Sequence, residues 1–406
     1  MVNVVRRIQE YNVGRDPDRL SMKYKNMRSS PFVFLRGTCH LFYENLPKSG
    51  IFKVGAKSAP LAWICGDMHL ENFGSYKGDN RLVYFDMNDF DEASLAPATW
   101  EIVRLLTSIQ IGAASFSASL IEANKLCQDF LDAYIAALSL GKPRWVERDT
   151  AVGIVGSLLN SLRERQRSSY LDSRTERKGR ARQRVIRIDG KKALAVTDKQ
   201  RAKVTTFMEK FAAEQGHPDF YKVLDVARRI AGTGSLGVER YIILVQGKGS
   251  PNGNYLLDLK QAAPCSLAAF LKVPQPKWSN DAERVVTIQR RVQAVSMAFL
   301  QAVTIGKKSY ILRGLQPTED RVSLDRATRS MDELKAVMQT MGHLVAWGQL
   351  RSSGRAGSAI ADDLIAFAQN EKWKKQMLIA AHDCAAQVNK DWKTYSKAYD
   401  DGEFEV

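Results

Sequence analysis

Apolar and polar positions divide the chain into helix-rich flanks and a strand-rich middle. The pattern is helical over residues 18–45 and 99–162. Amphipathic repeats return near the C-terminus, in residues 331–353 and 361–388. We therefore expect helices both before and after the strand-rich middle of the chain.

Short apolar runs predict the strands. Residues 61–67 and 81–89 have the composition of buried strands on either side of a polar loop. Gly, Pro and Asn in residues 246–253 predict a hairpin between two further strands. The remaining predicted strands cover residues 223–230, 238–245, 254–260 and 309–315, and the remaining predicted helices cover residues 198–214 and 281–303.

The order of these elements predicts an α+β fold. The strands cluster between Tyr221 and Leu315, with helices before and after them. We expect a small antiparallel sheet lobe inserted between two parts of a larger helical lobe. The predicted division is residues 1–200 for the first helical part, 201–320 for the sheet lobe and 321–406 for the part that completes the helical lobe.

Composition narrows the class of protein. The chain has 406 residues, of which 45% are apolar, so it can fill a sizeable core. Its longest uncharged stretch, residues 105–121, contains too many Ser and Thr residues for a membrane span. The N-terminus lacks the pattern of a secretory signal, and the five cysteines form no C-x-x-C pair. We expect a cytoplasmic protein with reduced thiols and no membrane partner.

The formal charge of +16 raises the question of a polyanionic partner. Residues 163–192 contain twelve Lys or Arg against four Asp or Glu, which is half of the net charge. This block is either a solvated basic face or a site for an anionic substrate. Nucleic acid is disfavoured, because no reading motif accompanies the charge and aromatic residues are not interleaved with it. Arg36 and Arg313, in apolar runs, either pair with carboxylates or bind an anionic group.

The run CGDMHLENFGSYKGDNRLVYFDMNDFDEA has the densest set of chemically useful side chains. Phosphoryl transfer needs a carboxylate near the attacking hydroxyl, and an amide and a second carboxylate on Mg²⁺. Asp67 is the predicted catalytic residue, with Asn72 and Asp86 as the metal ligands. Asp89 is a further metal ligand or an alternative base. The alternative is that these residues only cap turns between strands.

A second motif, GTGSLG, occupies residues 232–237 between two predicted strands. A glycine turn in that position is the kinase arrangement, in which backbone amides cover nucleotide phosphates. A lysine on the strand after the hairpin and an acid on the next helix would complete it. The predicted cofactor-binding residues are Gly232, Gly234, Ser235, Gly237, Lys260 and Glu283.

Together these motifs predict an ATP- and Mg²⁺-dependent phosphotransferase that acts on a hydroxyl acceptor. The glycine turn follows the catalytic loop in this chain, whereas in kinases it precedes the loop, so we expect a circularly permuted, protein-kinase-like two-lobed fold. The expected partners are a nucleotide and a substrate that carries negative charge. Two alternatives remain open at this point: a nucleotide-binding pseudokinase or interaction module, and an AMP transferase on the same scaffold.

Several runs resemble known families. SPFVFLRGT, GDMHLENFG, FDMNDFDEA, LKQA and LRSSGRAGSA resemble the bacterial domain-of-unknown-function family 2252 over nearly the whole chain. More distantly, CGDMHLEN resembles the H-G-D-x-H-x-x-N loop of aminoglycoside and choline kinase-like phosphotransferases. That second resemblance implies a catalytic role for Asp67 and metal-binding roles for Asn72 and Asp86. Cys65 stands where the histidine of that loop would be.

Overall fold

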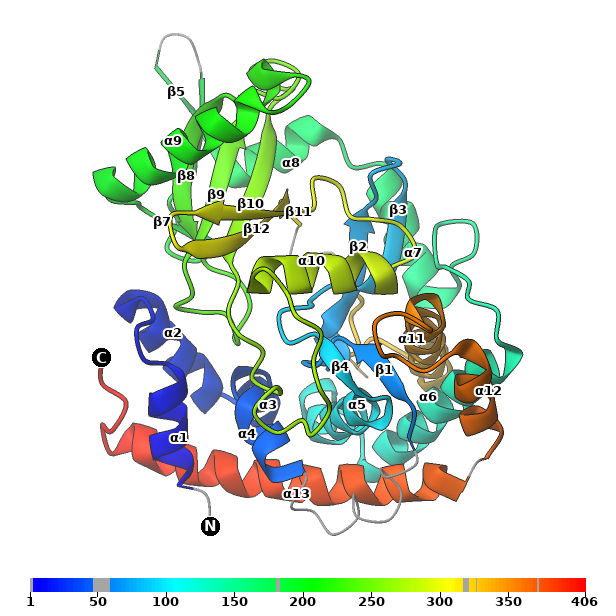
Figure 1. Ribbon diagram of the computed structural model, residues 1–406. Coiled ribbons are helices and arrows are strands. Elements are labelled where there is room, and N and C mark those ends of the chain that lie inside the picture. Colours follow the sequence, from blue (N-terminus) through cyan, green and yellow to red (C-terminus); the bar gives the residue numbers. More distant parts are fainter. Residues whose placement is uncertain (1–2, 47–58, 180–182, 317–320, 326, 371) are drawn as a thin grey trace.

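The computed structural model describes residues 3–46, 59–179, 183–316, 321–325, 327–370 and 372–406 (Figure 1). A small antiparallel sheet lies on one side of the molecule and most helices lie on the other (Figure 1). The mixed α+β class expected from the sequence is confirmed. None of the described helices is long and apolar enough to span a lipid bilayer.

The largest sheet has six strands in the order β11-β12-β10-β9-β8-β7. Side chains alternate between its two faces. Tyr241, Ile243 and Val245 pack toward helix α9, whereas Ile242 and Leu244 belong to a second apolar cluster on the opposite face. Burial on both faces explains the unbroken apolar run of β9. The bounds are β7 Ala193–Leu194, α9 Asp198–Ala213, β8 Val223–Arg229, β9 Arg240–Val245, β10 Tyr255–Gln261, β11 Gln301–Ile305 and β12 Lys308–Gly314.

The helical region is built around α5, whose residues are all buried. Helices α6 and α13 pack against α5, and α11 packs along α6. Capping boxes at Ser119 and Ser330 begin α6 and α11, because each serine and the glutamate three residues later bond each other's backbone amides. The bounds are α5 Thr99–Gly112, α6 Leu120–Leu140, α7 Gly153–Arg163, α11 Met331–Ser352, α12 Ala361–Gln369 and α13 Lys372–Asp400.

The helix predicted over residues 18–45 is in fact three helices. Ser30 caps a new helix whose first residue is Pro31, and proline at that position disfavours a helical residue before it. Thr38 then ends one helix and begins the next. The bounds are α1 Val4–Tyr11, α2 Pro17–Arg28, α3 Pro31–Gly37 and α4 Cys39–Asn45.

The segment expected to be a polar loop between two strands contains a strand of its own. Strand β2 pairs with β3, and β1 pairs instead with β4. Four of the five residues of β2 are buried although Gly and Ser weaken its apolar pattern. The bounds are β1 Leu61–Ile64, β2 Phe73–Lys77, β3 Val83–Met87 and β4 Ser94–Pro97, with a short 3₁₀ helix, η4, at Leu70–Asn72.

Two other regions differ from or refine the expectation. The helix predicted over residues 281–303 ends earlier, as α10 (Asp281–Val292), and residues 301–305 form strand β11 because they pair with β12. The described part of the basic block forms α8 (Arg167–Arg174), β5 (Thr175–Lys178) and β6 (Gln183–Ile186).

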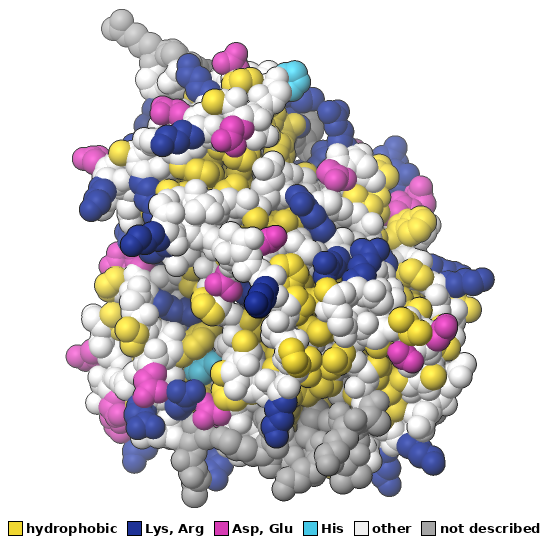
Figure 2. Space-filling view, in the orientation of Figure 1, with side chains coloured by type: hydrophobic (Ala, Val, Ile, Leu, Met, Phe, Trp, Pro, Cys, Tyr) yellow, Lys and Arg dark blue, Asp and Glu magenta, His cyan; other side chains and the backbone are white. Residues whose placement is uncertain are grey.

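Basic and acidic side chains are interspersed over the face seen in Figure 2. All five cysteines are buried and free.

The contact between α6 and α11 generates a stability prediction. A Cβ atom on Gly342 would lie 2.5 Å from the carbonyl oxygen of Phe130 and 3.0 Å from the amide nitrogen of Tyr134. Backbone atoms cannot move aside as a side-chain end can, so Gly342→Ala should force the two helices apart. We expect the free energy of unfolding to fall by roughly 1–3 kcal/mol, measured by urea denaturation.

Gln339→Ala, one turn earlier on α11, is the matched control, because it adds no atom to this contact. It should leave the unfolding midpoint nearly unchanged. Equal midpoints for Gly342→Ala and the wild type would contradict the close packing of these helices.

Candidate active site

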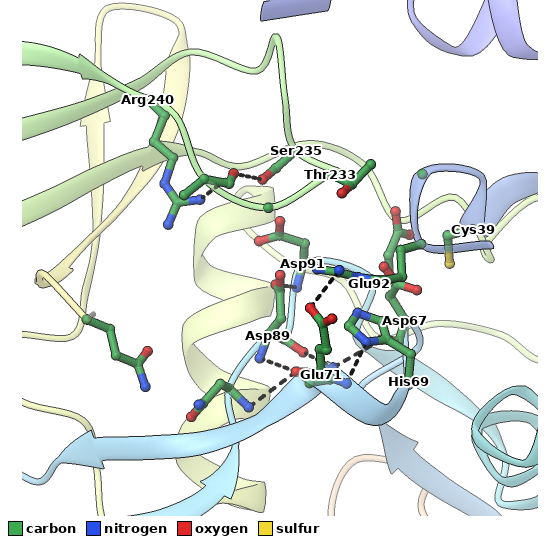
Figure 3. Close-up of a pocket in the computed structure, with 18 of the residues that line it drawn as sticks. Cys39, Asp67, His69, Glu71, Asp89, Asp91, Glu92, Thr233, Ser235 and Arg240 are labelled. Atoms are coloured by element: carbon green, nitrogen blue, oxygen red, sulfur yellow. Dashed lines mark hydrogen bonds and ion pairs between the residues drawn. The ribbon is translucent and has the colours of Figure 1, made fainter. Parts of the chain in front are cut away.

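A cavity lies between the small sheet and the loops that connect β1 to β4. It encloses about 1020 Å³ of space not filled by atoms, counted to its open mouth. Figure 3 shows Thr233 and Ser235 on one side of it, and Asp67, Asp89 and Asp91 on the other. The cavity therefore brings the two sequence motifs together, although 138 residues lie between residues 93 and 232.

The glycine turn connects β8 to β9 and lies directly against the catalytic-loop motif. Gly232 has a φ of +70°, which favours glycine. A Cβ atom on Gly234 would lie 3.0 Å from the carbonyl oxygen of Arg36 and 3.8 Å from Oδ2 of Asp67. Gly232, Gly234 and Ser235 line the cavity, whereas Gly237 lines a different one. Only part of the predicted glycine motif thus reaches the site.

The N-terminal helices hold this turn from outside. Nη1 of Arg15 donates to the carbonyl oxygens of Gly234, at 2.7 Å, and Leu236, at 2.9 Å. Nζ of Lys23, which is completely buried, donates to Gly234 at 3.3 Å. Burial, together with repulsion from Arg15, places the pKa of Lys23 well below its ordinary value. Neither Arg15 nor Lys23 was predicted from the sequence. The local pattern of apolar and polar residues does not show that a side chain contacts a turn far away in the chain.

Asp67 is held by a buried arginine. Nε of Arg104, on α5, donates to Oδ1 of Asp67 at 2.9 Å, and Nη2 donates to the same oxygen. No hydrogen bond from a described residue reaches Oδ2, the oxygen nearest the glycine turn. Burial raises the pKa of Asp67, and the charge of Arg104 only partly opposes this effect. One oxygen is thus positioned and the other remains available in the cavity.

The amide of Asn72 joins the two acidic loops. Its Nδ2 donates to the carbonyl oxygens of Asp67, at 3.1 Å, and Asp89, at 3.2 Å. Its Oδ1 accepts from the backbone amides of Asp89, at 2.7 Å, and Asn88, at 3.3 Å. With all these contacts the side chain acts first as a positioning group. Its predicted role as a metal ligand would need one of these bonds to open.

Lys260, on β10, pairs with acids of the cavity but is not itself among the residues that line it. Its side chain is 3% exposed, and Nζ forms an ion pair with Asp91 and lies 3.9 Å from Oδ1 of Asp89. The carboxylate of Asp89 is about half exposed, at 49%. Burial opposes ionisation of Asp89, but Lys260, Arg313 and Arg240 outweigh it and hold the pKa of that carboxyl below its ordinary value.

Two predicted site residues lie elsewhere. Asp86 is buried on β3, where Oδ1 accepts from the amide of Met87 at 2.8 Å and Oδ2 lies 3.4 Å from Nη2 of Arg351. Glu283 accepts from the amide of Ser279 at 2.7 Å and so caps α10. The acid that pairs with Lys260 is therefore Asp91, not Glu283. Successive side chains on a helix point about 100° apart. Arg284, and not Glu283, is therefore the residue of α10 that faces the loop of Asp91.

A buried charge cluster on the sheet was also missed. Asp258 is fully buried, and it bonds Arg240 through both oxygens, at 2.8 and 2.6 Å. Arg229 lies 2.7 Å from its Oδ2, and Nε of Arg313 donates to that oxygen at 3.2 Å. Burial opposes ionisation of Asp258, but the three arginines hold its pKa well below the ordinary value. The period-two spacing of Asp258 and Lys260 on one strand was the available signal, because it places both on one face.

The cavity offers carboxylates for a metal ion but not a complete set of ligands. Among the described residues, no group of three His, Cys, Asp or Glu side chains is arranged to hold a metal ion by itself. Mg²⁺ is usually bound through one or two carboxylates, with waters and substrate phosphates as the other ligands. Asp89, half exposed and ionised, offers such a carboxylate next to the glycine turn.

Fold and site together define an α+β protein with a charged cavity, in which a glycine turn faces two acidic loops. The chain belongs to the family DUF2252, described as an uncharacterized protein conserved in bacteria, whose model matches residues 15–398. No curated protein and no solved structure matches the chain.

A buried glutamate beneath the site generates a pH prediction. Glu101 accepts from the amide of Cys65, just before Asp67, at 2.9 Å, and from Nε2 of Gln349 at 2.9 Å. Burial raises its pKa to about 7. The folded state then binds more protons than the unfolded state between about pH 4.5 and 7. The contribution of Glu101 to the free energy of unfolding is complete below about pH 4.5, and it is lost as the pH rises through 7.

We expect Glu101→Gln, which stays neutral, to reduce the loss of unfolding free energy between pH 5.5 and 8 by about 2 kcal/mol. Guanidinium denaturation at both pH values measures this difference. Glu209→Gln, at an exposed position of α9, is the control and should keep the wild-type slope. Identical slopes for Glu101→Gln and the wild type would show that Glu101 ionises normally in the folded protein.

Proposed function

We propose that this protein is an ATP- and Mg²⁺-dependent phosphotransferase with a circularly permuted kinase-like fold, acting on a hydroxyl acceptor. The observation that carries the proposal is the contact between the glycine turn and Asp67 in one cavity. Glycine turns in kinases cover the nucleotide phosphates, and a catalytic aspartate receives the acceptor hydroxyl. Here Gly234 lies where a side chain of any other residue would press on Arg36 and approach Asp67.

The order of elements in the sheet supports the kinase comparison. The glycine turn joins two antiparallel strands, β8 and β9, and Lys260 lies on the next strand, β10. Helix α10 follows before β11 and β12. In protein kinases the lysine is likewise on the third strand and a helix follows it. The difference is the helix residue, since α10 presents Arg284 to the acidic loop and not a glutamate to the lysine.

The position of the chain ends supports the permutation. Helix α1 packs against α13, and Nε2 of Gln9 donates to the carbonyl oxygen of Glu403 at 2.9 Å. Segments near the two ends therefore touch, as the red and dark-blue ribbons in Figure 1 show. Permutation is tolerated where ends lie close together at a surface. If the two ends were joined and the chain were opened before the small sheet, the glycine turn and Lys260 would precede the Asp67 loop. That is the order found in kinases.

The residues described above have separate roles in this proposal. Oδ2 of Asp67 orients the acceptor hydroxyl and takes its proton, while Arg104 fixes Oδ1. The glycine turn and Lys260 contact the phosphates, so Lys260 exchanges Asp91 for a phosphate oxygen. Asp89 replaces Asp86 as the carboxylate that holds Mg²⁺, with Asn72 positioning its backbone. Bound Mg²⁺ would neutralise the charge on the transferred group.

The two candidate metal ligands give a matched pair of variants. We expect Asp89→Asn to weaken Mg²⁺-dependent binding of a nonhydrolysable ATP analogue at least tenfold, because it removes the carboxylate inside the cavity. Asp86→Asn should leave that binding within about twofold, since Asp86 lies outside the cavity. Isothermal titration with and without Mg²⁺ measures both, after circular dichroism has shown that each variant is folded.

The reverse result, binding lost in Asp86→Asn and kept in Asp89→Asn, would exclude Asp89 as the metal ligand. Absence of binding by the wild type at millimolar nucleotide would remove the proposal altogether.

Transfer itself is tested with labelled ATP. Label in the γ-phosphate should move to an acceptor or to water, and Asp67→Asn should slow this by about 10²–10⁴-fold, the range for loss of a general base. Glu10→Gln, at an exposed position outside the cavity, should retain the wild-type rate. Transfer of label from the α-phosphate only would identify an AMP transferase, and binding without any transfer would identify a nucleotide-binding module.

A further inference from the structure

A second cavity lies on the other side of the sheet edge from Asp67. Helix α8, strand β2 and the ends of β10 and β12 surround it, and it encloses about 1300 Å³ of space not filled by atoms, counted to its open mouth. Figure 1 shows α8 between the small sheet and the β2–β3 hairpin. Gln316 lines both cavities, and its Nε2 donates to the carbonyl oxygen of Ser75 between them.

The inner wall of this second cavity is apolar and aromatic. Leu171, Leu256 and Phe299 contribute to it, and the ring of Tyr255 lies 5.9 Å from that of Phe299, nearly perpendicular to it. Concave apolar surfaces with a few polar groups are typical of small-molecule sites. A flat apolar body would fit against these rings better than a compact ion.

The rim of the second cavity is cationic. Lys77, Arg165 and Arg167 line it, and none of the described residues that line it is Asp or Glu. Arg167 stacks over the ring of Tyr255, with Cζ 4.0 Å from the centroid. Neither Lys77 nor Arg167 forms an ion pair with a described residue. Partial burial and the positive charges of Arg167, Arg81 and Lys248 lower the pKa of Lys77. A bound anion would relieve this repulsion.

The start of helix α8 points to an anionic ligand. The helix begins at this cavity, with Gln166 as its N-cap and no side-chain hydrogen bond to its first turn. Free amides and the helix dipole favour an anion at such an end. A ligand with an anionic group and a flat ring would match both the cations and the aromatic wall of the cavity.

We propose that the second cavity is a binding site for a nucleoside monophosphate, separate from the Asp67 cavity. The phosphate lies at the start of α8 between Lys77 and Arg167, and the base packs against the apolar wall that Leu256 and Phe299 form. This assigns a role to the first residues of the basic block, which the phosphotransfer proposal does not use. The site needs no Mg²⁺ and no residue of the Asp67 cavity.

The test is titration of AMP, adenosine and inorganic phosphate into the full-length protein by calorimetry. AMP should bind at least tenfold more tightly than either fragment, because only AMP engages both the rings and the cations. The double variant Lys77→Gln/Arg167→Gln should weaken AMP binding at least tenfold. Lys199→Gln, an exposed charge on α9, is the matched control and should have no effect.

A second arm separates this site from the phosphotransfer site. AMP should bind Asp89→Asn as it binds the wild type, and should still bind when a Mg²⁺–ATP analogue is present at saturation. Loss of AMP binding in Asp89→Asn, full competition by the ATP analogue, unchanged binding in the double variant, or no AMP binding at millimolar concentration would each overturn the proposal. None of these results depends on whether the protein transfers phosphate.

Discussion

The sheet side of the site depends on the ion pairs that compensate the buried carboxylate of Asp258. A carboxylate without contact to water is stable only if charges and hydrogen bonds compensate it, and three arginines from three other strands do so here. Arg240 and Arg313 extend from this cluster into the cavity, and they hold Asp89 ionised together with Lys260. The state of the proposed metal ligand thus follows from a residue that does not line the cavity.

The loop side of the site depends on a similar compensation. Arg104 is completely buried on α5 and bonds both Asp67 and the carbonyl oxygen of Leu35, at 2.9 Å. Asn72 then connects the backbone of Asp67 with that of Asp89. These bonds keep two acidic loops together despite their mutual repulsion. Hydrogen bonds and ion pairs therefore hold the walls on both sides of the cavity in place.

The N-terminal segment fixes the glycine turn from outside the sheet. Arg15 and Lys23 bond the back of the glycine turn, and Arg228 on β8 pairs with Asp16 at 2.9 Å. The turn is consequently fixed by groups outside the sheet. The segment before residue 29 therefore bridges the sheet and the helical region, since α1 and α2 also pack against α13.

Periodicity and turn residues in the sequence were enough to predict the α+β class, the strand-rich middle and the helical flanks. These features are local, because periodicity and turn residues act over a few positions, and the strands at 223–229, 240–245 and 255–261 appeared where expected. Asp67 and Asn72 were singled out by their spacing on turns between apolar strands, and Lys260 because a lysine in an apolar strand is costly to bury without a partner. The glycine turn was identified by its spacing and by the strands on either side of it.

The pairing of the acids with their partners could not be predicted from the sequence. Asp86 and Asp89 are three residues apart, and the twist and pairing of β3 bury one beside Arg351 and place the other in the cavity. The partner of Lys260 came from a loop 169 residues away, not from the following helix. Arg104 and Asp258 lie in segments whose local pattern shows nothing about their partners. Such pairings are set by long-range packing, because the cost of burying a charge is compensated only by groups that the whole fold brings near it.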